Sequence, residues 1–289
     1  MRLGNIFKSV ALIAVLSFSA CSTQKGERMK LSIWDRGVKI TSPTDEGTFA
    51  YLWFYEWSLF DAVQEGEHKG GDSDWTWEID SEGTLAQSES DWFKISAEAT
   101  EDGADLLLEV TNNTERDWPD IAAIIPCFNP GFDGSKNTDA VPNLKFLDDS
   151  YTNTYFLGEN GLDLIAGDAP REIHFNHSQM PSIQGWDKER EDGQFIWYHK
   201  WPTSKRNAHA GLLVRESDDG TQTMAIAWDS FLTAQGHNPW KCMHLSVRLG
   251  PLKPGETKSI RGKIYLFDGS KEDCLAKFEN DFPYVKIGD

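Results

Sequence analysis

Residue types that suit acid–base chemistry gather in the stretch 194–215, where histidine and arginine are interleaved with tryptophan. Period-two alternation predicts a hairpin there, with one strand over 195–202 and a return strand over 208–215. If Pro202 pairs with Ala208, one face is aromatic and basic, because successive side chains of a strand point to opposite sides. That face carries Phe195, Trp197, His199, Trp201, His209, Gly211, Leu213 and Arg215; the other face, which we interpret as core, carries Ile196, Tyr198, Lys200, Ala208, Ala210, Leu212 and Val214.

Gly211 lies opposite His199 in this pairing, and a glycine inside a strand often marks a place where a ligand comes close. If Arg215 pairs with Thr223 of the next predicted strand, small residues form the floor of a groove, namely Ala225 and Ala227. A slip of one residue fills the groove instead with Met224, Ile226 and Trp228. The alternative is that the tryptophans pack in a sheet core and His199 is a core histidine.

These residue types suit elimination from a uronate, which needs a base, a cation for the carboxylate and a proton for the leaving oxygen. Histidine titrates near neutral pH, arginine holds a carboxylate by two hydrogen bonds, and indole rings cover the C–H faces of sugars. We predict a carbon–oxygen lyase or dehydratase acting on uronate-containing oligosaccharides. The acid and base are His199 and His209, the carboxylate is held by Arg215 or Arg206, and Tyr198 joins only if a bulge turns it to the open face.

Two other functions remain open. A surface protein that binds carbohydrate without catalysis would use Trp197, Trp201 and Trp240 as stacking platforms. A glycosidase or an epimerase is a third possibility, because Glu56, Asp61, Glu65 and Glu67 cluster, although acids in loops are usually just solvated.

The loop 235–240 is shaped by Gly236 and Pro239 and follows the strand placed beside the groove. It carries His237, Asn238 and Trp240, the mixture of groups that a sugar pocket uses. We predict that this loop closes one end of the groove. A structural turn with a buried Trp240 is the alternative.

Motifs for serine-based, nucleotide-dependent and zinc-protease chemistry are missing from the sequence. Cys242 and His244, with His237 nearby, suggest a metal, but a strand directs the first two to one side without supplying further ligands. We therefore expect neither a metal nor another cofactor.

The first 20 residues have the layout of a signal peptide: Arg2 and Lys8, an apolar run over 10–18, and small residues before Cys21. The run is too short for a membrane-spanning helix. The cysteine after the small residues resembles a bacterial lipobox. The resemblance implies that Cys21 carries the lipid, palmitate included, that 21–30 is a tether, and that the protein is anchored in the cell envelope, in the periplasm or on the outer-membrane surface. A plain secreted protein is the weaker alternative.

The chain is acidic, with a formal charge of −18 that becomes −20 once residues 1–20, with two basic and no acidic side chains, are removed. This charge argues against nucleic acid and against anionic lipid surfaces as partners. It is compatible with an anionic oligosaccharide or polysaccharide, because salt screens charges beyond roughly 8 Å. Three cysteines remain after lipidation, so at most one intrachain disulfide forms, and we expect Cys127 with Cys242.

Residues 31–289 are predicted to form a single all-β domain, a large antiparallel β-sandwich with one C-terminal helix. Strands are predicted over 31–40, 49–57, 75–79, 92–99, 105–111, 121–128, 155–165 (two), 171–177, 223–228, 242–249 and 258–267, with loops over 64–74, 129–151 and 231–243. Ser270 and Asp273 resemble a capping box at the start of the helix.

The many strands, the turn 251–256 before the closing strand, and Asn112 and Asn113 at a strand end resemble the sandwich of galactose-mutarotase-like carbohydrate proteins. With the lipoprotein leader and the tryptophan content, the chain is similar to lipoproteins that accompany ulvan-type lyases and dehydratases. The resemblance implies a carbohydrate substrate. It carries over no catalytic residue.

Overall fold

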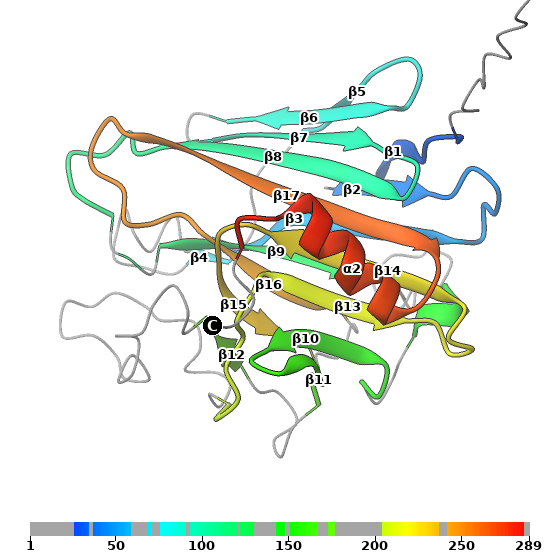
Figure 1. Ribbon diagram of the computed structural model, residues 1–289. Helices are drawn as coiled ribbons and strands as arrows, with labels where there is room; N and C mark the ends of the chain where they lie inside the picture. The colour runs from blue at the N-terminus through cyan, green and yellow to red at the C-terminus, as the bar shows by residue number, and fades with distance from the viewer. Residues whose placement is uncertain are drawn as a thin grey trace, which may run out of the picture.

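Two antiparallel sheets packed face to face, with one helix against the second sheet, make up the computed structural model (Figure 1). The structure describes residues 26–34, 37–58, 69–70, 76–90, 93–118, 120, 122–129, 143–147, 151–166, 173–176, 204–236 and 242–285. The predicted all-β sandwich is confirmed.

Sheet A has the strand order β1-β2-β3-β9-β16-β15-β12, and β4 pairs with β3. Its strands are β1 (Lys30–Trp34), β2 (Gly37–Thr41), β3 (Phe49–Ser58), β4 (Lys69–Gly70), β9 (Ala123–Asn129), β12 (Ile173–Phe175), β15 (Phe231–Gln235) and β16 (Met243–Arg248).

Sheet B has the strand order β11-β10-β13-β14-β17-β8-β7-β6-β5. Its strands are β5 (Glu78–Ile79), β6 (Leu85–Glu89), β7 (Phe93–Ala99), β8 (Gly103–Thr111), β10 (Thr154–Gly158), β11 (Gly161–Leu164), β13 (Leu212–Glu216), β14 (Gln222–Trp228) and β17 (Thr257–Asp268). The turn 251–256 is joined to the end of β8, because the Asn112 side chain donates a hydrogen bond to the Leu252 carbonyl.

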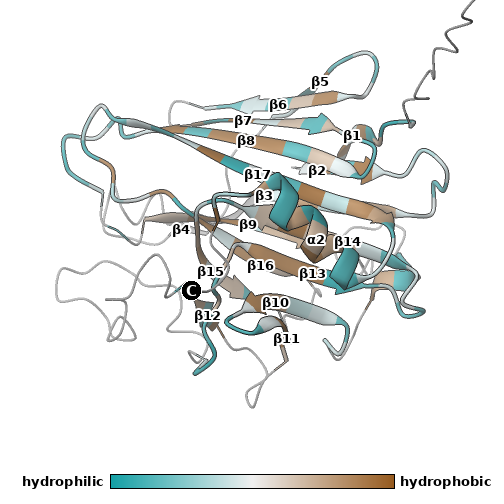
Figure 2. Cartoon of the chain, viewed as in Figure 1, coloured by the Kyte–Doolittle hydropathy of each residue, from teal (hydrophilic) through white to brown (hydrophobic). Residues whose placement is uncertain are grey.

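The main core lies between the two sheets and is built from alternate residues of each strand. Along β8 and β17 hydrophobic segments alternate with more polar ones (Figure 2). Trp228 is fully buried in this core and packs edge-on against Phe54. Gly262 makes room for it, since a Cβ atom there would lie 2.4 Å from the indole ring. Strand β17 therefore has a glycine at the position that pairs with Trp228, where the indole ring lies against the strand.

Helix α2 (Lys271–Asp281) packs on the face of sheet B that points away from sheet A. Cys274, Phe278 and Phe282 pack there against the small and apolar residues of β13 and β14. Ser270 and Asp273 form the predicted capping box, which is confirmed. Among the described residues, no helix is long and apolar enough to cross a membrane.

Several predicted strand boundaries are wrong. The expected strand over 31–40 is a hairpin of β1 and β2, with Trp34 paired to Gly37. Strand β6 was not predicted at all. Residues 231–235, predicted as loop, form β15 between β12 and β16. This last correction matters for function, because β15 contributes side chains to the site described below.

Candidate functional site

Most of the predicted site residues lie outside the part of the chain that the structure describes. In the hairpin and the loop that was expected to close the groove, they are Trp197, Tyr198, His199, Trp201, His237, Asn238 and Trp240. The predicted lipidation site, Cys21, also lies outside it. The roles predicted for these residues stay predictions. The signal peptide over 1–20 and the tether over 21–30 also stay predictions, and residues 1–25 lie outside the described part of the chain.

The predicted register of the following strands is wrong by one residue. Arg215 pairs with Met224, not with Thr223, and Leu213 pairs with Ile226. The face assigned to a ligand is therefore the interior between the sheets, where the larger side chains Leu213, Met224, Ile226 and Trp228 pack together. The opposite face is apolar, as predicted, but it is covered by α2.

Gly211 leaves no space for a ligand. A Cβ atom there would lie 2.0 Å from the carbonyl oxygen of Trp228 and 3.1 Å from the ring of Phe231. The glycine is needed because the backbone of β14 approaches closely, which is the other common reason for a glycine in a strand. The described half of the predicted groove is closed.

Arg215 is fully buried between the sheets. Its Nε donates to Thr154 Oγ1 at 2.8 Å and its Nη1 donates to the Phe146 carbonyl at 3.3 Å. The guanidinium also lies 5.0 Å from the ring centroid of Tyr151. These contacts tie the short helix η1 (Leu144–Phe146) and β10 to β13.

Arg206 is half-buried, and its guanidinium donates to the carbonyls of Leu164 at 2.7 Å and Ala166 at 3.3 Å. His209 is half-buried, and its backbone N–H donates to Leu157. Of the five predicted catalytic residues, the structure thus describes three. Two of those three are arginines with guanidiniums that bind backbone carbonyls.

A different set of chemically useful side chains lies on the outer face of sheet A, the face that points away from sheet B. Successive side chains of a strand point to opposite faces of the sheet. Met243, Leu245 and Val247 of β16 point into the core, so Cys242, His244 and Ser246 point outward. Cross-strand pairing aligns one row of residues across the sheet, which we call the cross-strand row. It consists of Trp34, Gly37, Trp53, Cys127, His244, Gln235 and Ile173.

One end of the cross-strand row is aromatic. The indole rings of Trp34 and Trp53 stack with centroids 5.2 Å apart and an angle of 10° between their planes. Gly37 permits this stacking across β2, because a Cβ atom there would lie 2.5 Å from Trp53 Cδ1. Tyr51 lies 3.9 Å from Trp34 and Phe49 lies 5.3 Å from Tyr51. We call Trp34, Phe49, Tyr51 and Trp53 the aromatic platform.

A cation lies at the aromatic platform. Lys39 Nζ is 4.2 Å from the centroid of the Phe49 ring, and Lys39 pairs with Tyr51 across β2 and β3. Lys39, Trp34 and Trp53 are half-buried, so they keep contact with solvent. Burial raises the pKa of Tyr51 above its ordinary value, so its hydroxyl is protonated at neutral pH.

The other end of the cross-strand row is polar and buried. Gln235 Nε2 and His244 Nδ1 are 3.1 Å apart, and both side chains are 4% exposed. In the neighbouring row, Thr233 and Ser246 share a hydrogen bond of 2.9 Å. Asn129 Nδ2 donates to Cys242 Sγ at 3.6 Å. Amide, hydroxyl, imidazole and thiol groups therefore share one face.

The expected disulfide between Cys127 and Cys242 is not formed, and both residues are buried free thiols, as is Cys274. Cys127 and Cys242 are nevertheless neighbours. Together with one imidazole nitrogen of His244, their sulfur atoms lie within 4.8 Å of one another.

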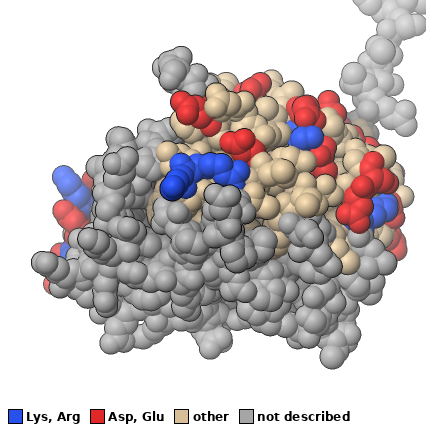
Figure 3. All heavy atoms as spheres, turned by 90° about the horizontal axis from the view of Figure 1, so that it is seen from below, with Lys and Arg blue, Asp and Glu red and all other residues tan. Residues whose placement is uncertain are grey.

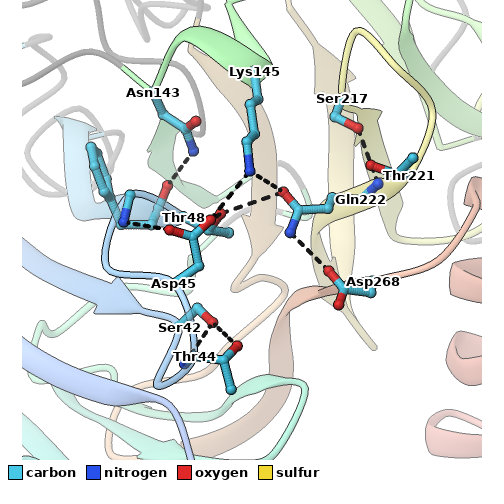
Figure 4. A network of polar contacts seen from close by, with 12 residues as sticks. Ser42, Thr44, Asp45, Thr48, Asn143, Lys145, Ser217, Thr221, Gln222 and Asp268 are labelled. Atoms are coloured by element: carbon cyan, nitrogen blue, oxygen red, sulfur yellow. Dashed lines mark hydrogen bonds and ion pairs between the residues drawn. The ribbon is translucent and has the colours of Figure 1, made fainter.

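A second polar cluster closes one end of the sandwich (Figure 4). Lys145 Nζ lies 3.2 Å from Asp45 and 3.4 Å from Gln222, and Gln222 donates to Asp268 at 2.8 Å. The pKa of Asp45 is below its ordinary value, chiefly through the hydrogen bond from Thr48 and that from Lys145. The contacts join η1 to the loop between β2 and β3 and to β14. A cavity of about 270 Å³ lies beside this cluster, and its walls include the carboxylates of Glu27, Glu101 and Asp268.

Lys258 is the one lysine among the described residues with a pKa lowered to about 8, chiefly because it is buried and then because Arg248 is nearby. Its Nζ donates to Ser230 Oγ at 3.1 Å and to the Arg248 carbonyl at 3.0 Å. Both contacts join the end of β17 to the ends of β14 and β16. We assign this lysine a structural role.

Charges of both signs are interspersed on the described part of the face shown in Figure 3, where acidic and basic groups lie close to one another. The described surface in this view has no single continuous acidic or basic field.

Sequence reasoning missed Lys39, Asn129, Thr233 and Cys127 as candidates for a site. The alternation of Val38, Lys39 and Ile40 places the lysine opposite two core residues, and this signal was readable. Cys127 was placed next to Cys242 only as a disulfide partner, and its position beside His244 depends on the pairing of β9 with β16.

No protein-family model and no curated protein matches the chain. Among solved structures it is similar to a galactose mutarotase-like protein from Lactobacillus casei, with 12% identity and a TM-score of 0.42 over 84% of this chain and 99% of that chain. It is also similar to an α-N-acetylgalactosaminidase from Bifidobacterium bifidum, with 10% identity and a TM-score of 0.42 over 89% and 39%. A polysaccharide lyase overlaps with 12% identity and a TM-score of 0.36 over 88% and 35%. These neighbours include the galactose-mutarotase-like group that the sequence resembles, but values this low establish no activity.

Proposed function

We propose that the outer face of sheet A binds a carbohydrate at the aromatic platform. The stacked indoles of Trp34 and Trp53 offer flat apolar area, which suits the C–H faces of a sugar ring. Asn129 lies beside Tyr51 in register, so a buried amide and a buried phenol lie next to that area. A few polar groups beside aromatic area are the usual composition of a small-molecule site.

The observation that carries this proposal further is the position of Lys39. Its ammonium group lies at the platform on the same face as Tyr51 and Asn129. A cation beside stacked aromatic rings favours a sugar that carries a carboxylate, and the half-buried position strengthens the interaction compared with open solvent. We therefore propose a uronate-containing oligosaccharide as the ligand.

The reaction that we propose is carbon–oxygen elimination. A base removes the proton on the carbon next to the uronate carboxylate, the electron pair forms the carbon–carbon double bond, and the bond to the leaving oxygen breaks. The leaving oxygen takes a proton and departs as an alcohol in a lyase or as water in a dehydratase. His199 remains the predicted acid or base. His209 is bonded through its backbone to Leu157 of β10 in sheet B, away from the platform, and is not assigned to this step. Lys39 replaces Arg206 and Arg215 as the group for the carboxylate, because those guanidiniums bind backbone carbonyls.

A carbohydrate-binding protein without catalysis is the second candidate. The observation that favours it is the position of His244, the histidine that the described structure places on this face. His244 is buried and paired with Gln235 at the far end of the cross-strand row from the platform. In this reading a sugar rests on the platform, and no acid–base group reaches it.

Lys39→Gln tests the binding proposal. We expect the affinity for a uronate oligosaccharide to fall about tenfold, which corresponds to ~1.4 kcal/mol, because the charged partner of the carboxylate is lost. Binding of the same oligosaccharide with its carboxylates reduced to alcohols should be unaffected by the substitution. Titration followed by tryptophan fluorescence and by calorimetry measures both.

Lys94→Gln is the matched control, since Lys94 is an exposed lysine in β7 of sheet B. It should bind both oligosaccharides as the unmodified chain does. Trp53→Ala should weaken both ligands. Full affinity in both Lys39→Gln and Trp53→Ala would place the binding site elsewhere.

Mass spectrometry of uronate oligosaccharides after incubation with the protein separates the two candidates. Loss of water indicates a dehydratase, and cleavage with a new double bond indicates a lyase. An unchanged mass together with Lys39-dependent binding supports the binding protein and contradicts the proposed elimination.

A further inference from the structure

Three side chains with metal-binding atoms meet on the outer face of sheet A. Cys127 comes from β9, and Cys242 and His244 come from the start of β16. Cys127 pairs directly with His244, and Cys242 points to the same side as His244 because the two are separated by one residue. The two sulfur atoms and one imidazole nitrogen lie within 4.8 Å of one another. The two strands thus bring together three side chains of the kinds that bind zinc.

The neighbours of these side chains have the chemistry of an outer ligand shell. Gln235 contacts His244 Nδ1 at 3.1 Å, which leaves Nε2 as the nitrogen for a metal. Ligation at Nε2 requires that Nδ1 donate its proton to the amide oxygen of Gln235, which a half-turn of the amide group provides in the same volume. Asn129 Nδ2 donates to Cys242 Sγ at 3.6 Å, a contact that stabilises a thiolate.

We propose that Cys127, Cys242 and His244 bind a zinc ion. Two thiolates and an imidazole are ligands that zinc prefers, with Zn–S near 2.3 Å and Zn–N near 2.1 Å in tetrahedral sites. Sulfur atoms at this bond length are about 3.8 Å apart, so shifts of about 1 Å bring the ligand atoms to the ion. Each thiol loses its proton to solvent on binding. Three protein ligands leave a fourth position for water or for another ligand.

No metal was expected from the sequence, for a definite reason. Cys242 and His244 offered two ligands on one side of a strand, and the third arrives from β9, which is distant in sequence. The three zinc ligands are not part of the aromatic platform, but the two sites are neighbours: Trp53 pairs with Cys127, and Asn129 pairs with Tyr51 and donates to Cys242. The zinc proposal requires no carbohydrate, so either proposal can fail while the other stands.

The metal content of the purified protein tests the proposal. The untagged chain, reduced, supplied with zinc and then passed through a desalting column, should retain about one zinc ion per chain by elemental mass spectrometry. Cys127→Ser, Cys242→Ser and His244→Asn should each retain little zinc. Cys274→Ser is the matched control, because Cys274 is a buried thiol of α2, on the other sheet, and it should retain the full amount.

Two further measurements guard against variants that fail to fold. Cobalt added to the unmodified chain should give the absorption bands of thiolate-to-cobalt charge transfer. Gln235→Leu, which leaves all three ligands in place, should lower zinc affinity by roughly 10- to 100-fold. A reduced, folded chain that retains no zinc and gives no such cobalt bands would overturn the proposal, and so would a Cys127–Cys242 disulfide that forms again with zinc present.

Discussion

Arg215 is a cation placed in the middle of an otherwise apolar core. Burial of a charge is costly unless hydrogen bonds compensate it, and the guanidinium supplies two of them, to Thr154 and to the Phe146 carbonyl. The aromatic ring of Tyr151 lies beside it. Arg215 therefore connects η1 and β10 to β13 from inside the sandwich.

Arg215→Ala should lower the free energy of unfolding by about 3 kcal/mol, because two acceptors lose their donor and a cavity remains. Urea unfolding followed by tryptophan fluorescence measures the change. Arg28→Ala is the control: Arg28 forms an ion pair of 3.1 Å with Glu98, with side chains 43% and 61% exposed, so its loss should cost less than about 1 kcal/mol. Equal losses in the two variants would contradict the structural role of Arg215.

At the residue scale the sequence indicated which side chains could do chemistry, but it did not indicate which groups each of them contacts in the fold. Gly211 was interpreted as a place where a ligand comes close, but the group that lies against it is the Trp228 carbonyl. Arg215 was assigned to a substrate because its face of the strand was taken to be open, whereas that face is the interior between the two sheets. The error of one residue in register then placed Ala225 and Ala227 on that face, where Met224 and Ile226 lie.

Helix α2 is fixed to sheet B by charge as well as by its apolar side. Lys263 of β17 lies 3.1 Å from Asp281 at the end of the helix and 3.3 Å from Asp102. Lys277 of the helix donates to Asp102 at 2.8 Å. Burial alone would raise the pKa of Asp102, but Lys277 and Lys263 outweigh it, so the pKa is below its ordinary value.

Lys277→Met should move acid unfolding to higher pH. A carboxylate with a depressed folded-state pKa contributes stability above its unfolded pKa, and this contribution is lost as pH falls through the folded pKa. Without Lys277 the burial of Asp102 remains, so its folded pKa rises and the loss begins at higher pH. Unfolding by urea between roughly pH 3 and pH 6, the range in which carboxylates titrate, measures the shift.

The control for this prediction is Lys94→Met, which removes an exposed lysine 3.9 Å from Glu89. Its acid unfolding should match that of the unmodified chain. A Lys277→Met profile that is displaced equally at all pH values would show that the lysine acts through its ammonium group over the Phe267 ring and not through Asp102.

At the element scale the sequence predicted most strands, because hydrophobic alternation and turn residues are local signals. The capping box at Ser270 was also local and is confirmed. Strand β15 was missed because Thr233 and Gln235 are polar although buried, and their partners Ser246 and His244 come from the next strand. A buried polar pair has no signature in either segment alone.

The whole molecule carries a formal charge of −18. Repulsion among like charges opposes the compact state, and salt shortens the range of that repulsion from roughly 30 Å at 0.01 M to roughly 3 Å at 1 M. The melting temperature at pH 8 should therefore rise with sodium chloride over this range. Differential scanning calorimetry measures it.

The same titration near pH 4.7, the isoelectric point of the sequence, is the control. There the net repulsion is small, so the melting temperature should respond much less to salt. An equal response at both pH values would indicate a general salt effect on burial and not the screening of charge.

The edge strands of the two sheets determine how readily one copy of the chain can add strands to another. Within the described part of the chain, sheet B ends on β5, with two residues, and β11, with four; sheet A ends on β12, with three, and on β1. The N–H of Leu31 in β1 is already bonded to the Gly83 carbonyl of the other sheet. Open strand edges are templates for fibril growth, and short or occupied edges present little backbone to an incoming chain. Amyloid-like self-assembly of this protein would therefore have to start from an opened molecule.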